Sequence, residues 1–180
     1  MKGIIFNLVE EVVTTAHGAD AWDTVLSAAG LEGAYTSLGS YPDEDLTKLV
    51  VAASDALGLP PDEVVRTIGV GAMPLLADRY PSFFAGHSTT RSFLLTLNEI
   101  IHPEVRKLYP GASVPDFTFE SSGADTLDLG YRSERRLCAL AEGFVLGASA
   151  HFGETVDLSQ PRCMLRGDES CLIHCVFSPA

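Results

Sequence analysis

The sequence predicts an α+β domain, in which a mainly helical N-terminal region packs against an antiparallel sheet. Two observations lead to this fold class. Apolar residues recur at helical spacing through most of residues 3–108, whereas short segments after Pro115 alternate apolar and polar residues. These later segments follow the order strand, strand, helix, strand, strand. The chain has 180 residues, which is enough for one domain with a sizeable core.

The N-terminal region is predicted to begin with four helices. Residues 3–17 are apolar at positions 4, 5, 8, 9, 12 and 13. Asp20 is typical of an N-cap for a second helix that ends near Ala29. A loop over 30–42 leads to a helix over 43–57, which Gly58 would end. The fourth helix opens at residues 60–63 with proline and acidic residues, and glycines 69 and 71 with Pro74 predict an irregular middle.

A further long helix is predicted after Ser88, which can cap it. Its apolar stripe consists of Phe93, Leu94, Leu97, Ile101, Val105 and Leu108. The segment "YPGASVPD" would end this helix.

The region after Pro115 is predicted to form the sheet. "DFTFES" and "TLDLGYR" read as a β-hairpin with "SSGAD" between them. "SERRLCALAEGFVLGASAHFG" is helical in pattern, and two more strands, "ETVDLSQPRCML" and "SCLIHCVF", flank a turn at Gly167-Asp168.

Composition excludes several classes of function. The formal net charge of -12 argues against nucleic acid and anionic membranes as partners. The sequence lacks the run of about 18 apolar residues that a membrane span needs. Its start, "MKGIIFNLVEEVV", is an amphipathic helix and not a signal peptide. The four cysteines then suggest reduced thiols or a metal site in a cytoplasmic domain.

His102 is the first candidate functional residue. It lies on the apolar side of its predicted helix, beside Leu94 and Val105. Such an imidazole is either a core histidine with one hydrogen-bonded nitrogen or a metal ligand, and a haem iron needs an axial donor inside an apolar pocket. Pro103 cannot donate to the carbonyl of Glu99, so a kink or a restarted helix is expected at His102.

The segment "YRSER" at 131–135 is the second candidate. In an extended chain Tyr131, Ser133 and Arg135 point the same way and offer a phenol, a hydroxyl and a guanidinium. This set suits an anion with several oxygens, such as a pair of carboxylates or a phosphate. The alternative is structural, with Ser133 as a helix cap and Arg135 in solvent.

Taken together, the two candidates resemble the haem nitric oxide/oxygen-binding (H-NOX) family, bacterial relatives of the haem domain of soluble guanylate cyclase. The resemblance also includes "MKGIIFN", "IHPEVRKLYPGASVPDF" and "LCALAEGFVLGASAHF", and so covers nearly the whole chain. It implies a haem buried between a distal helical lobe, residues 1 to about 60, and a proximal lobe with a four-stranded antiparallel sheet, about 61 to 180.

The resemblance implies the roles of individual residues. His102 would be the proximal ligand of a ferrous haem b, and Tyr131, Ser133 and Arg135 would hold its propionates. Pro115 and Ile5 would pack on the two faces of the porphyrin. Family members often carry a different residue after the histidine, so Pro103 is a departure that could alter the iron–histidine bond.

The expected distal pocket lacks a hydrogen-bond donor. Leu140 matches the distal tyrosine of oxygen-binding members, and Val9, Pro74 and Phe144 are the other expected pocket residues. We therefore expect a sensor that binds nitric oxide (and also carbon monoxide) and excludes oxygen. Nitric oxide would break the bond between iron and His102, and the conformational change would regulate a separate protein.

The implied partner is a histidine kinase or a cyclic-di-GMP enzyme, and the chain itself would not be an enzyme. Two other functions stay open on the sequence alone. One is a haem enzyme such as a peroxidase, although its chemistry requires a distal acid–base group. The other is a haem-free zinc or ligand-binding adaptor in which His102 is a core residue.

The cysteines suggest a second metal. Cys138 lies on the predicted helix after the clamp, and Cys163 and Cys171 flank the hairpin turn, so three thiolates could bind zinc. Buried free cysteines are the alternative. Some bacterial H-NOX proteins bind zinc with three cysteines and a histidine, but the histidine position is Gln160 in this sequence. Cys175 could replace it only if the strand bends, since four strand residues span about 13 Å.

Overall fold

The computed structural model describes the whole chain except Ser122, which falls within the predicted hairpin turn. Along the chain its helices and strands are α1 (Gly3–His17), α2 (Ala19–Ala29), α3 (Asp43–Leu57), α4 (Pro61–Arg79), α5 (Pro81–Phe84), α6 (Thr90–Leu94), the π-turn η1 (Leu97–Ile101), α7 (His102–Leu108), β1 (Asp116–Glu120), β2 (Thr126–Arg132), α8 (Cys138–His151), β3 (Glu154–Arg162), the 3-10 turn η2 (Met164–Arg166) and β4 (Cys171–Pro179).

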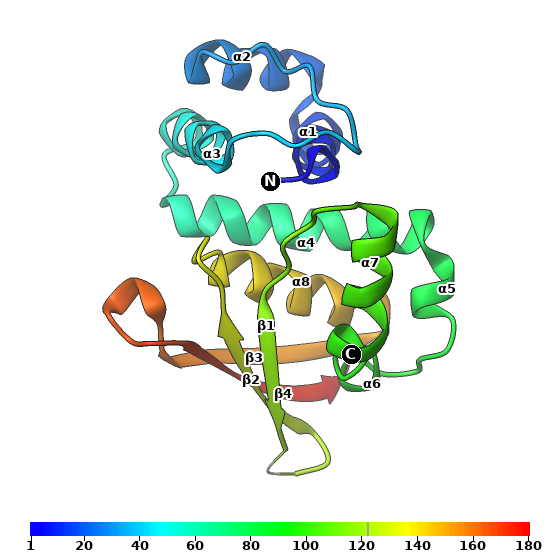
Figure 1. Ribbon diagram of the computed structural model, residues 1–180. Coiled ribbons are helices and arrows are strands. Elements are labelled where there is room, and N and C mark those ends of the chain that lie inside the picture. The colour runs from blue at the N-terminus through cyan, green and yellow to red at the C-terminus, as the bar shows by residue number, and fades with distance from the viewer. Residues whose placement is uncertain (122) are drawn as a thin grey trace.

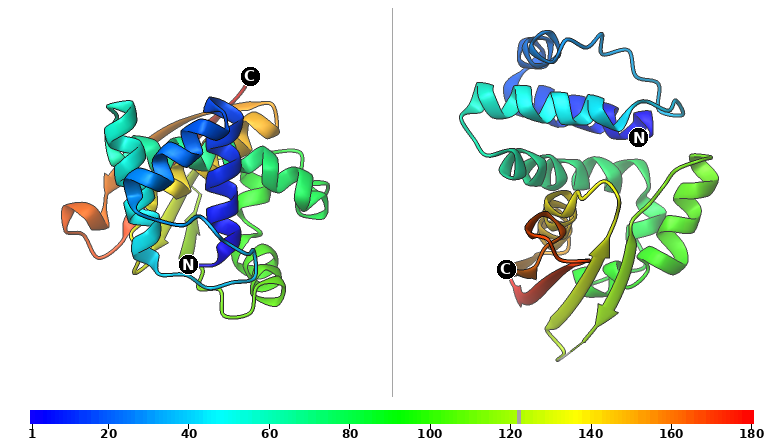
Figure 2. Two further views of the ribbon diagram at one scale, coloured as in Figure 1. Left: turned by 90° about the horizontal axis from the view of Figure 1, so that it is seen from above. Right: turned by 60° about the vertical axis from the view of Figure 1, so that its left-hand side comes forward.

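The elements form layers (Figure 1). Helices α1, α2 and α3 lie on one side of α4, and α8 lies between α4 and the sheet. The right-hand view of Figure 2 shows the same order, with α5, α6 and α7 grouped beside the end of α4. The predicted fold class is therefore confirmed. No helix in the described part of the chain is long and apolar enough to cross a bilayer.

The first three helices follow the predicted boundaries, with one correction. Gly58 ends α3 in the left-handed conformation, as predicted. Asp20 was expected to cap α2, but the N-cap residue is Gly18 and Asp20 lies inside the first turn. A carboxylate there still stabilises the helix, because the N-terminal end of the helix dipole is positive.

Helix α4 is continuous, so the prediction of an irregular middle was wrong. Pro74 lies inside it, and close packing explains the glycine at 69. A Cβ on Gly69 would lie 2.9 Å from the Cα of Gly143, and a Cβ on Gly147 would lie 2.8 Å from the carbonyl oxygen of Val70. The glycines therefore allow α4 and α8 to pack at very short distance.

The single long helix predicted after Ser88 is divided into α6, η1 and α7. Thr89, not Ser88, caps α6, and its hydroxyl accepts from the N–H of Ser92. In η1 the N–H of His102 donates five residues back, to Leu97. Pro103 then opens α7, where a missing N–H costs little. The predicted break at His102 is therefore confirmed, in the form of a π-turn.

The sheet is antiparallel with the strand order β1-β2-β4-β3. The predicted hairpin pairs Phe117 with Tyr131, and Tyr131 in turn pairs with Cys171 on β4. Helix α8 begins at Cys138, five residues later than predicted, because residues 133–137 form a turn in which Arg136 adopts φ +52°. Buried side chains of β2 and β4 form the main core with one side of α8.

Two tyrosines tie the end of α7 to the end of α4. The hydroxyls of Tyr80 and Tyr109 are in hydrogen-bond contact, and Tyr109 is buried against Ile4, Leu8 and Ala72. We expect Tyr109→Phe to lower the free energy of unfolding by about 1 kcal/mol at neutral pH, because Tyr80 loses its buried partner. Chemical denaturation measures the loss, and Tyr35→Phe in the N-terminal helical layers is the control.

The same substitution should change the alkaline stability. Burial and the Tyr80 hydroxyl raise the pKa of Tyr109 to about 12. The unfolded chain therefore releases this proton first, near its ordinary pKa of about 10, and stability falls as pH rises from there towards the folded pKa. Tyr109→Phe should flatten that part of the profile. An unchanged slope would show that Tyr109 does not carry the dependence.

Candidate functional site

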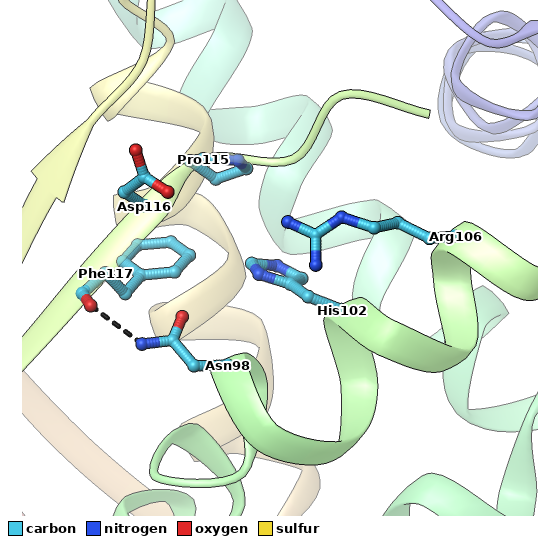
Figure 3. A pocket seen from close by; sticks show the side chains of 6 residues that line it. All are labelled: Asn98, His102, Arg106, Pro115, Asp116 and Phe117. Carbon is cyan, nitrogen blue, oxygen red and sulfur yellow. Dashed lines mark hydrogen bonds between the residues drawn. The ribbon is translucent and has the colours of Figure 1, made fainter. Parts of the chain in front are cut away.

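His102 is the first residue of α7 and lines a pocket of about 230 Å³. The lining residues are Asn98, His102, Arg106, Pro115, Asp116 and Phe117, drawn in Figure 3. Burial, followed by the charge of Arg106, lowers the pKa of His102 to about 4, although Asp116 acts in the opposite direction. The imidazole is therefore neutral at physiological pH, which is the form that binds a metal.

Phe117 is the main pocket residue that sequence reasoning missed. Its ring centroid lies 5.6 Å from that of His102 and 5.7 Å from that of Tyr131. It therefore joins the histidine on α7 to the start of the "YRSER" segment. The alternation of β1 could have revealed it, because a strand partner of buried Tyr131 faces the same side of the sheet.

Tyr131, Ser133 and Arg135 come together through a turn. Tyr131 lies near the end of β2 as a buried residue, and its hydroxyl accepts from the N–H of Leu137 at 3.0 Å. Ser133 hydrogen-bonds to Tyr131, which opposes the rise in the tyrosine pKa that burial causes. The N–H of Arg135 donates to Ser133 Oγ at 3.3 Å. The expectation of one extended segment was therefore wrong, since β2 ends at Arg132 and the chain turns.

The Arg135 guanidinium is bound to a carboxylate from another layer. Its Nε donates to Asp43 Oδ2 at 2.7 Å, and its Nη1 donates to the carbonyl of Ser113 at 3.1 Å. Asp43 opens α3, so this ion pair joins the N-terminal helices to the turn after β2. A larger cavity of about 680 Å³ lies beside Ser133 and Arg135. The sequence carries no signal for this contact, because the partners are 92 residues apart.

The expected distal residues fall into two groups, with one exception. Val9 is buried, and Leu140 packs against the same cluster as Val9. Ile5 and Phe144 pack against a neighbouring cluster that contains Tyr109. Pro74 is exposed on α4, whereas the preceding residues 72 and 73 are buried.

The residues present fit a haem. His102 offers one neutral imidazole, and Pro115 with Phe117 provides apolar contacts beside it. Arg135 already pairs with a carboxylate, and Tyr131 and Ser133 lie next to it, which suits the propionates of a porphyrin. A histidine is one of the axial donors by which proteins hold a haem iron.

Three of the four cysteines form a compact buried group. The sulfur atoms of Cys138, Cys163 and Cys171 all lie within 4.8 Å of one another, and those of Cys138 and Cys163 are 3.7 Å apart. Zn–S bonds of about 2.3 Å in a tetrahedron place the sulfurs about 3.8 Å apart, so the spacing fits zinc. Burial raises the pKa of Cys138 to about 12. The Cys138 sulfur would therefore be a thiol unless a metal displaces its proton.

The structure does not bring Cys175 to this group. It is fully buried farther along β4, and burial raises its pKa to about 12. Gln160 instead lies beside the Cys138 thiol, where it offsets part of the rise in that pKa. His174 faces the other side of the sheet, with its Nδ1 2.5 Å from Asp128.

Comparisons with known proteins agree with this arrangement. A family model described as haem-NO-binding matches residues 2–160. An H-NOX protein from S. oneidensis in the Fe(II)NO state has a TM-score of 0.92 and 31% identity, and the match covers 99% of each chain. The unliganded Fe(II) H-NOX protein from K. algicida has a TM-score of 0.88 and 26% identity, covering 100% of this chain and 98% of that one.

One further relative is a much longer protein. Soluble guanylate cyclase gcy-31 of Caenorhabditis elegans is 27% identical over 139 residues, which are 76% of this chain and 20% of the cyclase. The chain therefore spans about a fifth of the length of that relative.

Proposed function

Because this chain belongs to the haem-NO-binding (H-NOX) family of haem-based gas sensors related to soluble guanylate cyclase, we propose that it senses nitric oxide through a ferrous haem b. It excludes oxygen and passes the signal to a separate protein. A histidine kinase or a cyclic-di-GMP enzyme is the proposed partner, and the chain itself catalyses no reaction.

The apolar character of the distal residues carries the proposal. Ile5, Val9, Leu140 and Phe144 have no side-chain hydrogen-bond donor. A ferrous haem would need a nearby hydrogen-bond donor from the protein to hold oxygen, whereas it would need none to hold nitric oxide. Tyr109 packs against the cluster that Ile5 and Phe144 contact, but its hydroxyl is engaged with Tyr80.

The chain's own residues would act as follows. His102 would bind the haem iron through a ring nitrogen, and Tyr131, Ser133 and Arg135 would bind the propionate groups. Pro115 and Ile5 would provide apolar contacts to the porphyrin. A ferrous haem, when bound, supplies the metal that takes up the gas.

Release of His102 is the proposed switch. Once the imidazole no longer holds α7 to the cofactor, α7 can shift relative to β1. We propose that the distal lobe, residues 1 to about 60, then rotates against the proximal lobe, about 61 to 180. A ligand can drive such a change only by its different affinity for two states.

Absorption spectra of the reduced protein test this function. We expect a five-coordinate ferrous haem whose band shifts with nitric oxide and with carbon monoxide but not with air. A stable spectrum of an oxygen complex would contradict the exclusion of oxygen. Protein that binds no haem would favour the zinc or ligand-binding adaptor, and turnover of hydrogen peroxide would favour a peroxidase.

We further propose that Cys138, Cys163 and Cys171 bind zinc, with Gln160 or water completing the shell. Protein purified without chelators should contain about one zinc per chain. Cys171→Ser should lose that metal, because the remaining two thiolates form an incomplete site. Cys175→Ser is the matched control, since Cys175 is equally buried on the same strand. Equal zinc contents in the two variants would contradict the proposed ligands.

A further inference from the structure

The π-turn brings Asn98 and His102 to the same pocket. They are four positions apart in the sequence, and both line the pocket beside β1. Because the His102 N–H donates to Leu97 and Pro103 has no N–H, the backbone around Asn98 lacks the regular pattern of an α-helix. Pro103, which departs from the family pattern, therefore affects the backbone of Asn98, one turn before the histidine.

The side-chain amide of Asn98 has a defined orientation. Its Nδ2 donates to the carbonyl of Phe117 at 2.7 Å. This carbonyl belongs to β1, which lies at one edge of the sheet. The opposite amide orientation would place two oxygens against each other, so the nitrogen must face the strand. The Asn98 amide oxygen is then left to point into the pocket that His102 lines (Figure 3).

The other polar groups of the pocket are Arg106 and Asp116. Arg106 can only donate. Asp116 carries a carboxylate whose charge acts to raise the pKa of His102, so it is the competing acceptor. Figure 3 draws a hydrogen bond for Asn98 and none for Asp116. A histidine that binds a metal through one ring nitrogen generally donates its other N–H to a nearby oxygen. Asn98 is the pocket residue whose amide is held by a hydrogen bond to β1, which leaves its oxygen free to accept this N–H.

On the basis of the proposed haem-sensing function, we propose that the Asn98 amide oxygen accepts a hydrogen bond from the ring nitrogen of His102 that does not bind iron. Asn98 is then a positioning residue that sets the strength of the histidine–iron bond. A neutral amide is a weaker acceptor than a carboxylate, so it transfers less negative charge to the imidazole. The bond stays weak enough for nitric oxide to release His102.

Substitutions at Asn98 should move this bond in opposite directions. Asn98→Asp keeps the size and adds a negative charge, so it should raise the iron–histidine stretching frequency in the resonance Raman spectrum of the ferrous protein. Asn98→Leu removes the acceptor and should lower that frequency. Release of His102 after mixing with nitric oxide should be about tenfold slower in Asn98→Asp than in wild type. Glu99→Gln, at an exposed residue that does not line the pocket, is the control and should leave both measurements unchanged, whereas Asp116→Asn tests the competing acceptor.

Each outcome bears on one proposal. If wild type shows no iron–histidine band, the proposed haem function itself fails. If wild type shows the band but both Asn98 variants leave it unmoved, or move it in the same direction, Asn98 is not the acceptor. A shift in Asp116→Asn with none in Asn98→Leu would assign the acceptor to Asp116 and overturn the proposal. Asn98 is exposed, so neither variant leaves a buried cavity.

Discussion

His102→Ala is expected to separate gas binding from signalling. The variant should bind haem only when free imidazole is added, because imidazole can take the axial position without being joined to α7. Nitric oxide would then displace the added imidazole. Because this imidazole is not joined to the chain, its release would not move α7. The protein should therefore respond to nitric oxide spectroscopically while its conformation stays the same.

Hydrogen exchange measures whether nitric oxide changes the conformation of the protein. In wild type, nitric oxide should change exchange in residues 97–109 and across the helices α1 to α3. In His102→Ala with imidazole, those regions should exchange alike with and without gas. His87→Ala replaces a histidine outside the pocket and should behave as wild type. A full exchange response in rescued His102→Ala would mean that the signal does not pass through this bond.

Leu140→Tyr is expected to convert the protein into an oxygen binder. Leu140 lies on α8 and packs against the cluster that includes Val9, and a tyrosine hydroxyl there would add the missing donor. A hydrogen bond to a charged acceptor contributes about 1.5–3 kcal/mol, which corresponds to roughly a 10- to 100-fold gain in oxygen affinity. Spectra of the reduced protein in air measure the change.

Leu140→Phe is the matched control for this substitution. It adds the aromatic ring without the hydroxyl, so it should still exclude oxygen. If Leu140→Phe bound oxygen as well as Leu140→Tyr, the cause would be pocket shape and not hydrogen bonding. If neither variant bound oxygen, Leu140 would not face the gas.

Most secondary structure was predictable because each element depends on local properties. Helix α3 has a helical apolar pattern and ends at a glycine, and the hairpin β1–β2 alternates with period two. Two of the errors arose where backbone geometry departs from these periods. The helix predicted after Ser88 is interrupted by a π-turn, and a left-handed residue at Arg136 delays α8. A window of apolar residues does not reveal such local changes.

In the candidate site too, some residues were predictable from the sequence and others were found only in the structure. His102, Tyr131, Ser133 and Arg135 were chosen for the chemistry of their side chains and for their resemblance to a family motif. Phe117 and Asn98 were not chosen, because an aromatic and an amide residue are common in strands and helices. Their importance comes from contacts between segments: Phe117 lies beside His102 and Tyr131, and Asn98 donates to the Phe117 carbonyl.

Residue patterns were enough to predict the fold class and the residue types that could bind a porphyrin, and the resemblance of the motifs to a known family indicated the family. These properties follow from periodicity and from motifs that lie within single segments. The contacts between groups came from the packed chain: Asp43 with Arg135, Tyr80 with Tyr109, three cysteines without the fourth, and Asn98 with the carbonyl of Phe117. Such contacts join segments far apart in the chain, and they depend on how helices and strands pack, which no local pattern encodes.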